Sequence, residues 1–354
     1  MKEADEHGAD FKKDWMLKRQ STMPKALTLT GEDFVKVGFL DQNQLLPLVV
    51  EPRFNGSKLH AWAKENLEFI QTSLTRHGGI LFRGFDLKSL SDFSLFLEAV
   101  SIELMTYMES ATPRTELSEK IYTSTEFPPG HAISLHNELT YVTAWPMKIW
   151  FFCLQPSETG GETPIADVRR VFNRISPAIR DRFIRKGWIL MRNFNDGLGL
   201  SWQASYHTTD REAVERYFVR NDIEFEWKEG ERLRTRQVRP AVARHPKTGE
   251  MVWFNHVAFW NVSGLDKGLS EAVQAIMKEE DLPYNTYYGD GRPIEPEVIE
   301  EIREAYKQET VIFRWQAGDV LMLDNMLVAH GRNPYTGERK ILVAMGEPSS
   351  DRGL

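Results

Sequence analysis

The chain has 354 residues, of which 41% are hydrophobic and 27% charged, and these fractions are typical of a globular protein with a sizeable core. Its formal net charge of −7 argues against nucleic acid or an anionic membrane surface as the main partner. The single cysteine, Cys153, excludes an intrachain disulfide, and no apolar run approaches the roughly 20 residues that cross a bilayer. Because the first residues are charged and polar rather than apolar, a cytoplasmic location is expected.

The predicted elements begin with a polar arm over residues 1–27, which is expected to be flexible, with an ordered helix as the alternative. Residues 28–354 contain no linker and no internal repeat, so they are predicted to form a single domain. Apolar residues at helical spacing predict one helix over residues 57–76, which should end at the paired glycines that follow it. Further elements are predicted in the same way: strands at 45–51, 80–85, 147–154 and 188–193, and helices at 91–101, 167–174, 177–186 and 210–220.

Residues 102–130 have little periodicity and contain several prolines, which predicts a long loop of the kind that covers active sites. Short strands dominate the rest of the chain. They are expected at 224–227, 235–244, 251–255, 310–315, 320–323, 326–330 and 340–345, and helices are expected near 269–279 and 295–307. Many short antiparallel strands with helices outside them predict a mostly β protein built on a jelly-roll barrel, a double-stranded β-helix of the cupin type.

Two polar residues that are two positions apart, His136 and Glu138, lie in a segment predicted to be extended. Because alternate residues of a strand point to the same side, the imidazole and the carboxylate could bind one metal ion. A third ligand is expected downstream, and His330 is the candidate. Two histidines and one carboxylate on a face of an octahedron are the ligand set of non-haem Fe(II) oxygenases. Taken alone, a His-x-Glu pair is equally compatible with an ordinary polar surface strand.

Longer stretches around these residues carry a resemblance to a known family: Leu135-His-Asn-Glu138, Gly160-Gly-Glu-Thr163, Asn195-Asp-Gly-Leu-Gly-Leu200, Val252-Trp-Phe-Asn255 and Leu323-Asp-Asn-Met-Leu-Val-Ala-His-Gly-Arg332. From about residue 75 to 346 the chain resembles the taurine-dioxygenase-like (TauD/TfdA) family of Fe(II)- and 2-oxoglutarate-dependent oxygenases. Within that family it is similar to the branch of the syringomycin-type aspartyl hydroxylases and clavaminate-synthase-like enzymes.

The resemblance implies that His136, Glu138 and His330 bind Fe(II) and that 2-oxoglutarate and O2 are the co-substrates. Related halogenases have a small residue in place of the carboxylate, which frees a coordination position for halide. Because Glu138 is present in this chain, the resemblance favours hydroxylation or another oxygen-derived outcome over halogenation.

The resemblance also implies residues for 2-oxoglutarate. Arg339 is expected to bind its distal carboxylate, since a planar guanidinium can bind a carboxylate through two hydrogen bonds. Thr163 is expected to donate its hydroxyl to the same carboxylate. Arg332 is the competing arginine, but it follows His330 by only two residues, so the next strand is better placed to reach the far end of a five-carbon diacid.

Substrate-binding residues are predicted from local patterns. Arg234, Arg236 and Arg239 belong to a run that alternates along an expected strand, so they are predicted to share one face and to bind a carboxylate or phosphate, or to face solvent. Other candidates for the substrate pocket are Trp202, Phe254, Asn255 and Trp260. Among the remaining histidines, only His131 and His256 are candidates for a functional role.

The function expected from the resemblance is hydroxylation of an unactivated C–H bond in an amino acid or amino-acid-derived compound of specialised metabolism, with release of succinate and CO2. The sequence leaves open whether the substrate is free or attached to a peptidyl carrier protein, and it allows a homodimer. One alternative keeps the iron site but gives desaturation, cyclisation or C–C cleavage. Another is a zinc-binding protein without oxygen chemistry, because two histidines and one carboxylate also form zinc sites.

Overall fold

The computed structural model describes residues 34–41, 44–101, 103–106, 109, 114–125, 127–195, 199–264, 277–350 and 353. The predicted arm over residues 1–27 lies outside the described residues, as do residues 269–276 of the helix predicted over 269–279.

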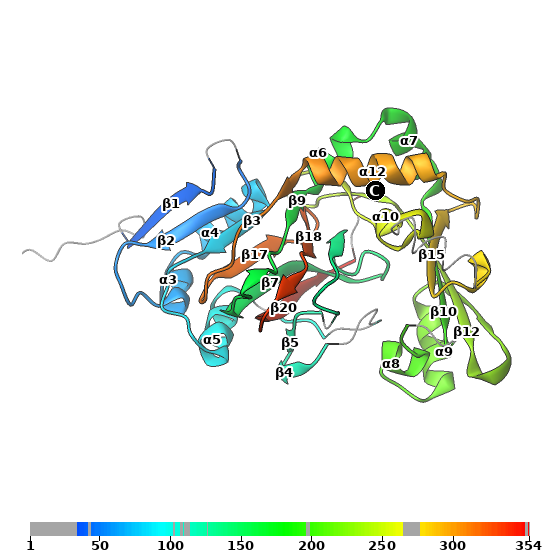
Figure 1. The fold of residues 1–354 in the computed structure, drawn as a ribbon, viewed down its shortest axis with the longest axis horizontal. Coiled ribbons are helices and arrows are strands. Elements are labelled where there is room, and N and C mark those ends of the chain that lie inside the picture. The colour runs from blue at the N-terminus through cyan, green and yellow to red at the C-terminus, as the bar shows by residue number, and fades with distance from the viewer. Residues whose placement is uncertain are drawn as a thin grey trace, which may run out of the picture.

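The largest sheet has eight strands in the order β1-β2-β3-β17-β7-β20-β5-β4 (Figure 1). Neighbouring strands are antiparallel except for β2 and β3, which are parallel. The strands are β1 (Val35–Phe39), β2 (Leu48–Pro52), β3 (Gly79–Phe82), β4 (Glu116–Ser118), β5 (Ile121–Thr123), β7 (Trp145–Gln155), β17 (Val320–Asp324) and β20 (Lys340–Ser349).

A second antiparallel sheet, in the order β16-β9-β18-β6, packs against the large one. Its strands are β6 (Ile133–His136), β9 (Ile165–Asp167), β16 (Thr310–Val311) and β18 (Val328–Arg332), and a two-stranded ladder of β8 (Thr159–Gly160) and β19 (Tyr335–Thr336) lies beyond it. The rings of Phe151 on β7 and His330 on β18 are 5.0 Å apart, which places the functional strands of the two sheets face to face. Two packed sheets with helices outside them are the jelly roll that the sequence predicts.

Strand β7 shows why its sequence is apolar at nearly every position. Ile149 and Phe151 belong to the core between the two sheets, whereas Trp150 and Phe152 belong to a second core on the other face of the large sheet. All four side chains are buried. A strand with a protein layer on each face has no solvent side, so it keeps no polar alternation.

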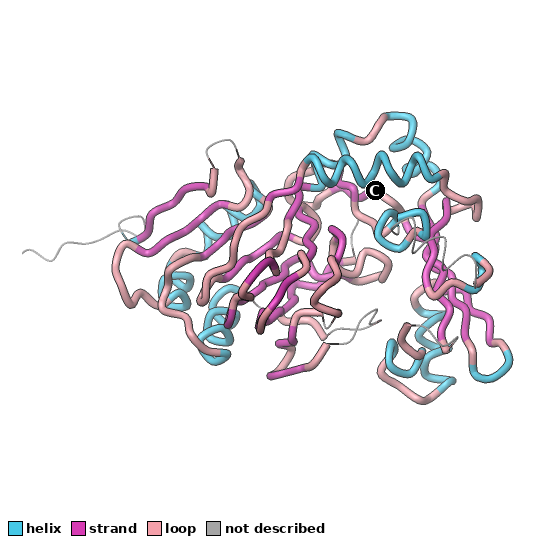
Figure 2. The backbone as a smooth tube through the Cα atoms, in the orientation of Figure 1, coloured by secondary structure: helices cyan, strands magenta, loops and turns pink. Residues whose placement is uncertain are grey.

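Three helices form the outer layer on the large sheet: α3 (Leu59–Glu65), α4 (Leu67–His77) and α5 (Leu90–Val100). The single helix predicted over 57–76 is wrong in one respect, because it is broken between α3 and α4. The break is at Asn66, whose side-chain amide donates to the carbonyl of Trp62 at 2.8 Å and satisfies the end of α3. Figure 2 shows that these and the other helices flank the strands.

A separate antiparallel sheet, in the order β11-β12-β10-β15, lies apart from the jelly roll in Figure 1. Its strands are β10 (Trp188–Phe194), β11 (Ile223–Trp227), β12 (Leu233–Arg239) and β15 (Tyr284–Tyr288), and α8 (Trp202–Tyr206) and α9 (Arg211–Arg220) pack on it through a small apolar core of their own. The strand predicted over 235–244 is wrong, because Pro240 ends β12 and the chain enters a different pair of strands, β13 (Val242–Arg244) and β14 (Met251–Trp253).

The remaining described helices lie between the second sheet and the separate sheet β11-β12-β10-β15. They are α6 (Val168–Arg174), α7 (Pro177–Lys186), α10 (Val257–Trp260) and α12 (Pro296–Gln308), and short 3-10 turns lie at Glu229–Glu231, Val262–Gly264 and Glu279–Asp281. Within the parts of the chain that the structure describes, no helix combines the length and the hydropathy needed to cross a membrane.

Candidate metal centre

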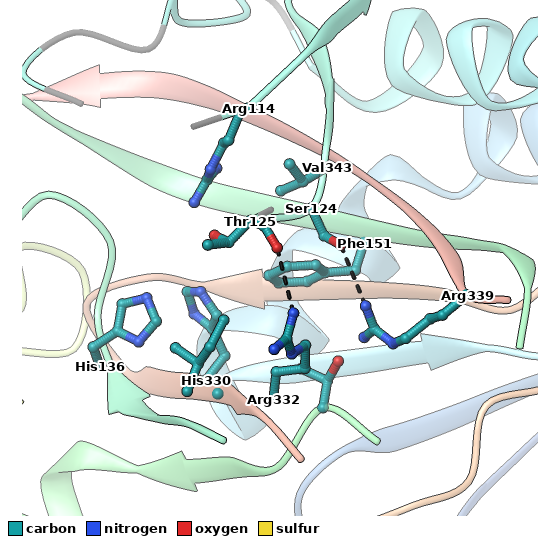
Figure 3. Close-up of a pocket in the computed structure, with 12 residues that line it drawn as sticks. Arg114, Ser124, Thr125, His136, Phe151, His330, Arg332, Arg339 and Val343 are labelled. Carbon is teal, nitrogen blue, oxygen red and sulfur yellow. Dashed lines mark hydrogen bonds between the residues drawn. The ribbon is translucent and has the colours of Figure 1, made fainter. Parts of the chain in front are cut away.

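The two histidines of the predicted triad lie on neighbouring strands. β6 and β18 pair antiparallel, and His136 is the register partner of His330. The centroids of the two imidazole rings are 4.6 Å apart (Figure 3). Sheet pairing therefore brings together two side chains that are far apart in the sequence.

Glu138 lies just beyond the end of β6, and the residue that fixes its backbone is Asn325. The Glu138 amide donates to Asn325 Oδ1 at 2.7 Å, and Asn325 Nδ2 donates to the carbonyls of Glu138 at 2.9 Å and Pro146 at 2.8 Å. In addition, Asn137 Nδ2 donates a hydrogen bond to the Asn325 carbonyl at 2.6 Å. Because all of these groups are buried, the segment that carries Glu138 is held to the turn before β18.

The candidate ligand atoms of His136, Glu138 and His330 all lie within 4.8 Å of one another. Glu138 Oε2 is 3.7 Å from His330 Nε2. His136 Nδ1 is 2.9 Å from the carbonyl of Ser134, and a donated hydrogen bond there leaves Nε2 as the ring atom with a free lone pair. In the searched, described part of the chain, no other group of three such side chains meets this criterion.

Burial lowers the pKa of His136, and it lowers the pKa of His330 well below the usual value for histidine. The positive charge of Arg114 lowers both further. Both imidazoles are therefore neutral at neutral pH, which is the form that binds a metal. Two neutral nitrogen donors and one carboxylate oxygen fit a divalent transition metal with open coordination positions.

A cavity extends from the two histidines to Arg339 (Figure 3). In the figure His136 and Arg339 lie at its opposite ends, with Arg332 between them. The described residues that line the cavity are Arg114, Ser124, Thr125, Ile133, His136, Phe151, Thr163, His330, Gly331, Arg332, Arg339 and Val343. The cavity thus has a metal-binding end and a cationic end, as a ligand with two acidic ends requires.

Arg339 is positioned by the turn after β8. Its Nε donates to the carbonyl of Gly161 at 2.9 Å, and its Nη1 donates to Ser124 Oγ at 3.2 Å. Gly161 has a φ of +70°, and a Cβ there would lie 2.4 Å from Ser157 Oγ and 3.1 Å from Arg339 Cδ, so this position requires glycine. Burial lowers the pKa of Arg339 to about 10, which still leaves the side chain charged at neutral pH.

Thr163 is buried and lines the same cavity. Its Oγ1 accepts a hydrogen bond from Trp315 Nε1 at 3.1 Å. Because the indole N–H can only donate, the hydroxyl proton of Thr163 remains available for an acceptor in the cavity. This role of Trp315 was not foreseen from the sequence, which placed it in a strand over 310–315, whereas β16 ends at Val311 and Trp315 lies beyond it.

Arg332 also lines the cavity, but its guanidinium holds a loop. Nη1 donates to the carbonyl of Phe127 at 2.9 Å, and Nη2 donates to those of Pro128 at 2.8 Å and His131 at 2.9 Å. Three backbone carbonyls thus satisfy this charge within the protein, which supports Arg339 as the arginine for a bound carboxylate.

Arg114 is a site residue that the sequence analysis missed. It lines the cavity, and its Nη2 donates to Glu138 Oε2 at 2.9 Å. The available signal was weak: Arg114 is the one arginine in the predicted loop 102–130, whose irregular sequence does not indicate where a side chain points.

The predicted common face of Arg234, Arg236 and Arg239 is wrong. Arg239 is an odd number of residues from the other two, so the strand turns it to the opposite, buried face, where its Nε donates to the carbonyl of Tyr141 at 2.8 Å. Arg234 is paired with Asp281 at 3.1 Å, and Arg236 is exposed. Neither lines the cavity that contains the histidines.

The other predicted substrate residues also lie away from this cavity. Trp202 packs against Trp227 in the small apolar core of the sheet β11-β12-β10-β15. Phe254 packs edge-on against Trp145. The side-chain amide of Asn255 donates to the carbonyl of Ala241 at 2.6 Å, which connects a loop to a strand end. Their role in substrate binding stays a prediction.

Of the two histidines selected for a functional role, His256 lies beside the centre. Its ring centroid is 5.6 Å from that of His136, and it stacks on Trp260 at 4.4 Å. Its Nδ1 is 2.5 Å from Thr140 Oγ1. His131 is exposed, and its backbone carbonyl accepts from Arg332.

Comparison with known proteins identifies relatives for most of the chain. The model of the family described as "Taurine catabolism dioxygenase TauD, TfdA family" matches residues 41–345. The dapdiamide synthesis protein DdaC of Enterobacter agglomerans is 39% identical over 279 residues, which are 79% of this chain and 85% of DdaC. A clavaminate synthase-like protein of Arabidopsis thaliana is 28% identical over 292 residues, 80% of this chain and 85% of that protein.

Solved structures share the fold. PvcB, described as an Fe, alpha-ketoglutarate dependent oxygenase from an isonitrile synthetic pathway, is 16% identical with a TM-score of 0.52, and the match covers 92% of this chain and 94% of PvcB. AAD-2, solved in complex with Mn(II) and N-oxalylglycine, is 11% identical with a TM-score of 0.51, covering 90% of this chain and 99% of AAD-2. These likenesses confirm the predicted fold class.

Proposed function

The chain belongs to the TauD, TfdA family of dioxygenases, and from this membership we propose that it is an Fe(II)- and 2-oxoglutarate-dependent hydroxylase of a small amino-acid-like molecule. The observation that carries the proposal is a single cavity with His136 and His330 at one end, where Glu138 lies beside them, and Arg339 at the other.

His136, Glu138 and His330 would hold Fe(II), because their donor atoms converge and both imidazoles are neutral. Bound Fe(II) with 2-oxoglutarate and O2 supplies the oxidising power for C–H hydroxylation, with succinate and CO2 as co-products. Three such ligands would leave coordination positions of the metal open for the co-substrates.

Arg339 would bind the distal carboxylate of 2-oxoglutarate, and Thr163 would donate its hydroxyl proton to the same group. Nη2 of Arg339 makes no hydrogen bond with the described residues, while Nε and Nη1 anchor the side chain. Phe151 and Val343 line the cavity between its two ends and exclude water from the co-substrate.

The substrate class is supported by the relative with a stated biosynthetic role. DdaC is described as a dapdiamide synthesis protein, and its match covers most of both chains. We therefore place this enzyme in natural-product biosynthesis, acting on an amino acid or a derivative, either free or attached to a peptidyl carrier protein.

The test is O2-dependent succinate formation from 2-oxoglutarate, measured with a panel of free and carrier-attached amino acids, together with the mass of each product. Hydroxylation adds one oxygen atom, whereas desaturation and oxidative cyclisation each remove two hydrogens. A substrate that stimulates succinate formation and gains one oxygen supports the proposal. Stimulated succinate formation with loss of two hydrogens would replace hydroxylation by the alternative outcome at the same iron site.

A further inference from the structure

Asp324 is the last residue of β17, and its carboxylate fixes the turn that leads to β18. Its Oδ1 accepts hydrogen bonds from the backbone amides of Met326 at 3.0 Å and Leu327 at 3.3 Å. The side chain of Asp324 is only 7% exposed. Because buried amides need acceptors, this carboxylate sets the conformation of the turn between the two strands.

A histidine that follows a different pair of strands holds the carboxylate of Asp324 in place. His245 comes directly after β13 and is fully buried. Its Nδ1 accepts from the backbone amide of Thr248 at 3.1 Å, so the ring proton is on Nε2. That Nε2 donates to Asp324 Oδ2 at 3.1 Å. The two oxygens of one carboxylate therefore accept from two separate parts of the chain.

Asn325 is the residue through which this turn reaches the metal centre. Its side chain accepts from the amide of Glu138 and donates to the carbonyl of Glu138, and its own carbonyl accepts from Asn137. The position of Asn325 depends on the turn, and the turn depends on Asp324. A continuous series of buried groups thus runs from His245 through Asp324 and Asn325 to Glu138.

We propose that Asp324 and His245 are positioning residues of the metal centre, which hold the carboxylate of Glu138 where it can bind the metal together with the two histidines. The inference rests on the metal-binding part of the proposed function. It adds two residues that lie outside the triad and do not line the cavity described above. Residues that orient metal ligands contribute to metal affinity, because a ligand that is already oriented loses less conformational freedom on binding.

The hydrogen bonds of this series require a carboxylate at position 324. Both oxygens of an aspartate accept, whereas the amide group of an asparagine presents donor hydrogens on one side. In Asp324→Asn those hydrogens would face either the Nε2–H of His245 or the amides of the turn, so one set of bonds is lost. Substitutions at position 245 separate two cases: His245→Gln retains an N–H that can donate to Asp324, and His245→Ala removes it.

The test is a titration of the full chain with Co(II), in which calorimetry measures the affinity and the visible absorption spectrum reports the geometry of the ligands. Asp324→Asn should bind Co(II) about 10–100-fold more weakly than wild type, the range typical of residues that orient metal ligands. Its spectrum at saturating Co(II) should differ from that of wild type. His245→Ala should change affinity and spectrum in the same direction, and His245→Gln should lie closer to wild type in both.

Asp319 provides the matched control, because it is a buried carboxylate that precedes β17, at the opposite end of the strand from Asp324. Its Oδ2 accepts from the backbone amide of Gln316 at 2.8 Å and from Arg83 Nη2 at 2.6 Å. Asp319→Asn should therefore lower the midpoint of urea unfolding, as Asp324→Asn does. It should leave the Co(II) affinity and spectrum unchanged, because none of these bonds leads to Glu138.

Two results would overturn the inference. One is an Asp324→Asn variant that unfolds at a lower urea concentration but keeps the Co(II) affinity and spectrum of wild type. The other is an equal loss of affinity in Asp319→Asn and Asp324→Asn, because that loss would follow from stability alone. If Asp324→Asn does not fold, the two substitutions of His245 decide, and equal Co(II) binding in both refutes the role.

Failure of the proposed function looks different in the same titration. If wild type does not bind Co(II), the metal centre itself is refuted, and the positioning role with it. If wild type binds Co(II) with an affinity that does not depend on Asp324 or His245, only the positioning role is refuted.

Discussion

The metal end of the cavity and strand β12 both contain several ionisable side chains, but these side chains have different partners in the two regions. At the metal end, His136 and Glu138 come from one segment and His330 from another, and the three side chains turn toward one another. On β12, Arg234 pairs with Asp281 and Arg239 bonds to backbone carbonyls. Groups that face a shared cavity can act on a ligand, whereas groups already satisfied by the protein hold the fold.

The largest effect that this comparison predicts is for His330→Ala. Loss of a ligand on β18 should lower the rate of substrate-dependent succinate formation at least roughly a thousandfold, because a bound metal lowers the activation free energy by several kcal/mol. Succinate is measured by chromatography under saturating Fe(II). Arg234→Ala on β12 is the control and should keep most of the activity. Near-normal turnover in His330→Ala would refute the triad.

Two of the three arginines that line the cavity, Arg339 and Arg332, should also differ from each other. Arg339→Ala should raise the KM for 2-oxoglutarate about 10–100-fold, the loss expected for a buried charge-assisted pair. Arg332→Ala should instead lower the thermal stability, because its guanidinium holds the loop carbonyls of Phe127, Pro128 and His131. Steady-state kinetics and thermal unfolding of both variants check the distinction. A larger rise in the KM for Arg332→Ala than for Arg339→Ala would reverse the assignment.

We expect Asn325 to contribute both to the free energy of unfolding and to the metal affinity. Asn325→Ala removes three buried side-chain hydrogen bonds that hold the segment of Glu138, so it should destabilise the protein by about 2–4 kcal/mol and weaken metal binding. Denaturant unfolding and calorimetric Co(II) titration measure the two effects. The account is contradicted if Asn325→Ala unfolds more easily but binds Co(II) as tightly as wild type, since the asparagine would then support only the fold.

The smallest effect predicted is a pH dependence of the metal-free protein. His136 and His330 have lowered pKa values in the folded state, so the unfolded chain binds more protons once the pH falls below about 6.5. Burial of the two neutral imidazoles therefore does not reduce the free energy of unfolding above that pH, but it reduces it increasingly as the pH falls below that value. The midpoint of urea unfolding should fall as the pH is lowered from 7 to 5, and less steeply in His330→Ala. An identical slope in that variant would show that His330 does not contribute.

Much of this site could be predicted from the sequence because the residues that indicate its chemistry lie close together in short stretches of the chain. His136 and Glu138 are two residues apart, and the stretch around His330 carries its own family pattern. The nearly continuous apolar run of β7 and the end of α4 at Gly78 were likewise local signals. The hydrogen bonds between Asn325 and Glu138 could not be predicted, because the two residues are far apart in the sequence.

Features that depend on three-dimensional context were missed. Arg114 stands in an irregular loop, where no periodicity tells which way a side chain points. The prediction that the three arginines of β12 share one face is wrong, because Arg239 is an odd number of residues from Arg234 and Arg236 and therefore points to the opposite face. Trp202 and Phe254 are aromatic residues near recognised motifs, and the cores of the outer sheet and the jelly roll account for their burial.

The central claim, that one cavity holds Fe(II) at the triad and 2-oxoglutarate between the metal and Arg339, is tested most directly by anaerobic titration with both. Wild type should develop the weak visible absorption band of the iron-bound keto acid, and the band should be lost or need far more 2-oxoglutarate in Arg339→Ala. If wild type shows no band under Fe(II) and 2-oxoglutarate but binds Zn(II) tightly, the cavity is a zinc site and the account is contradicted.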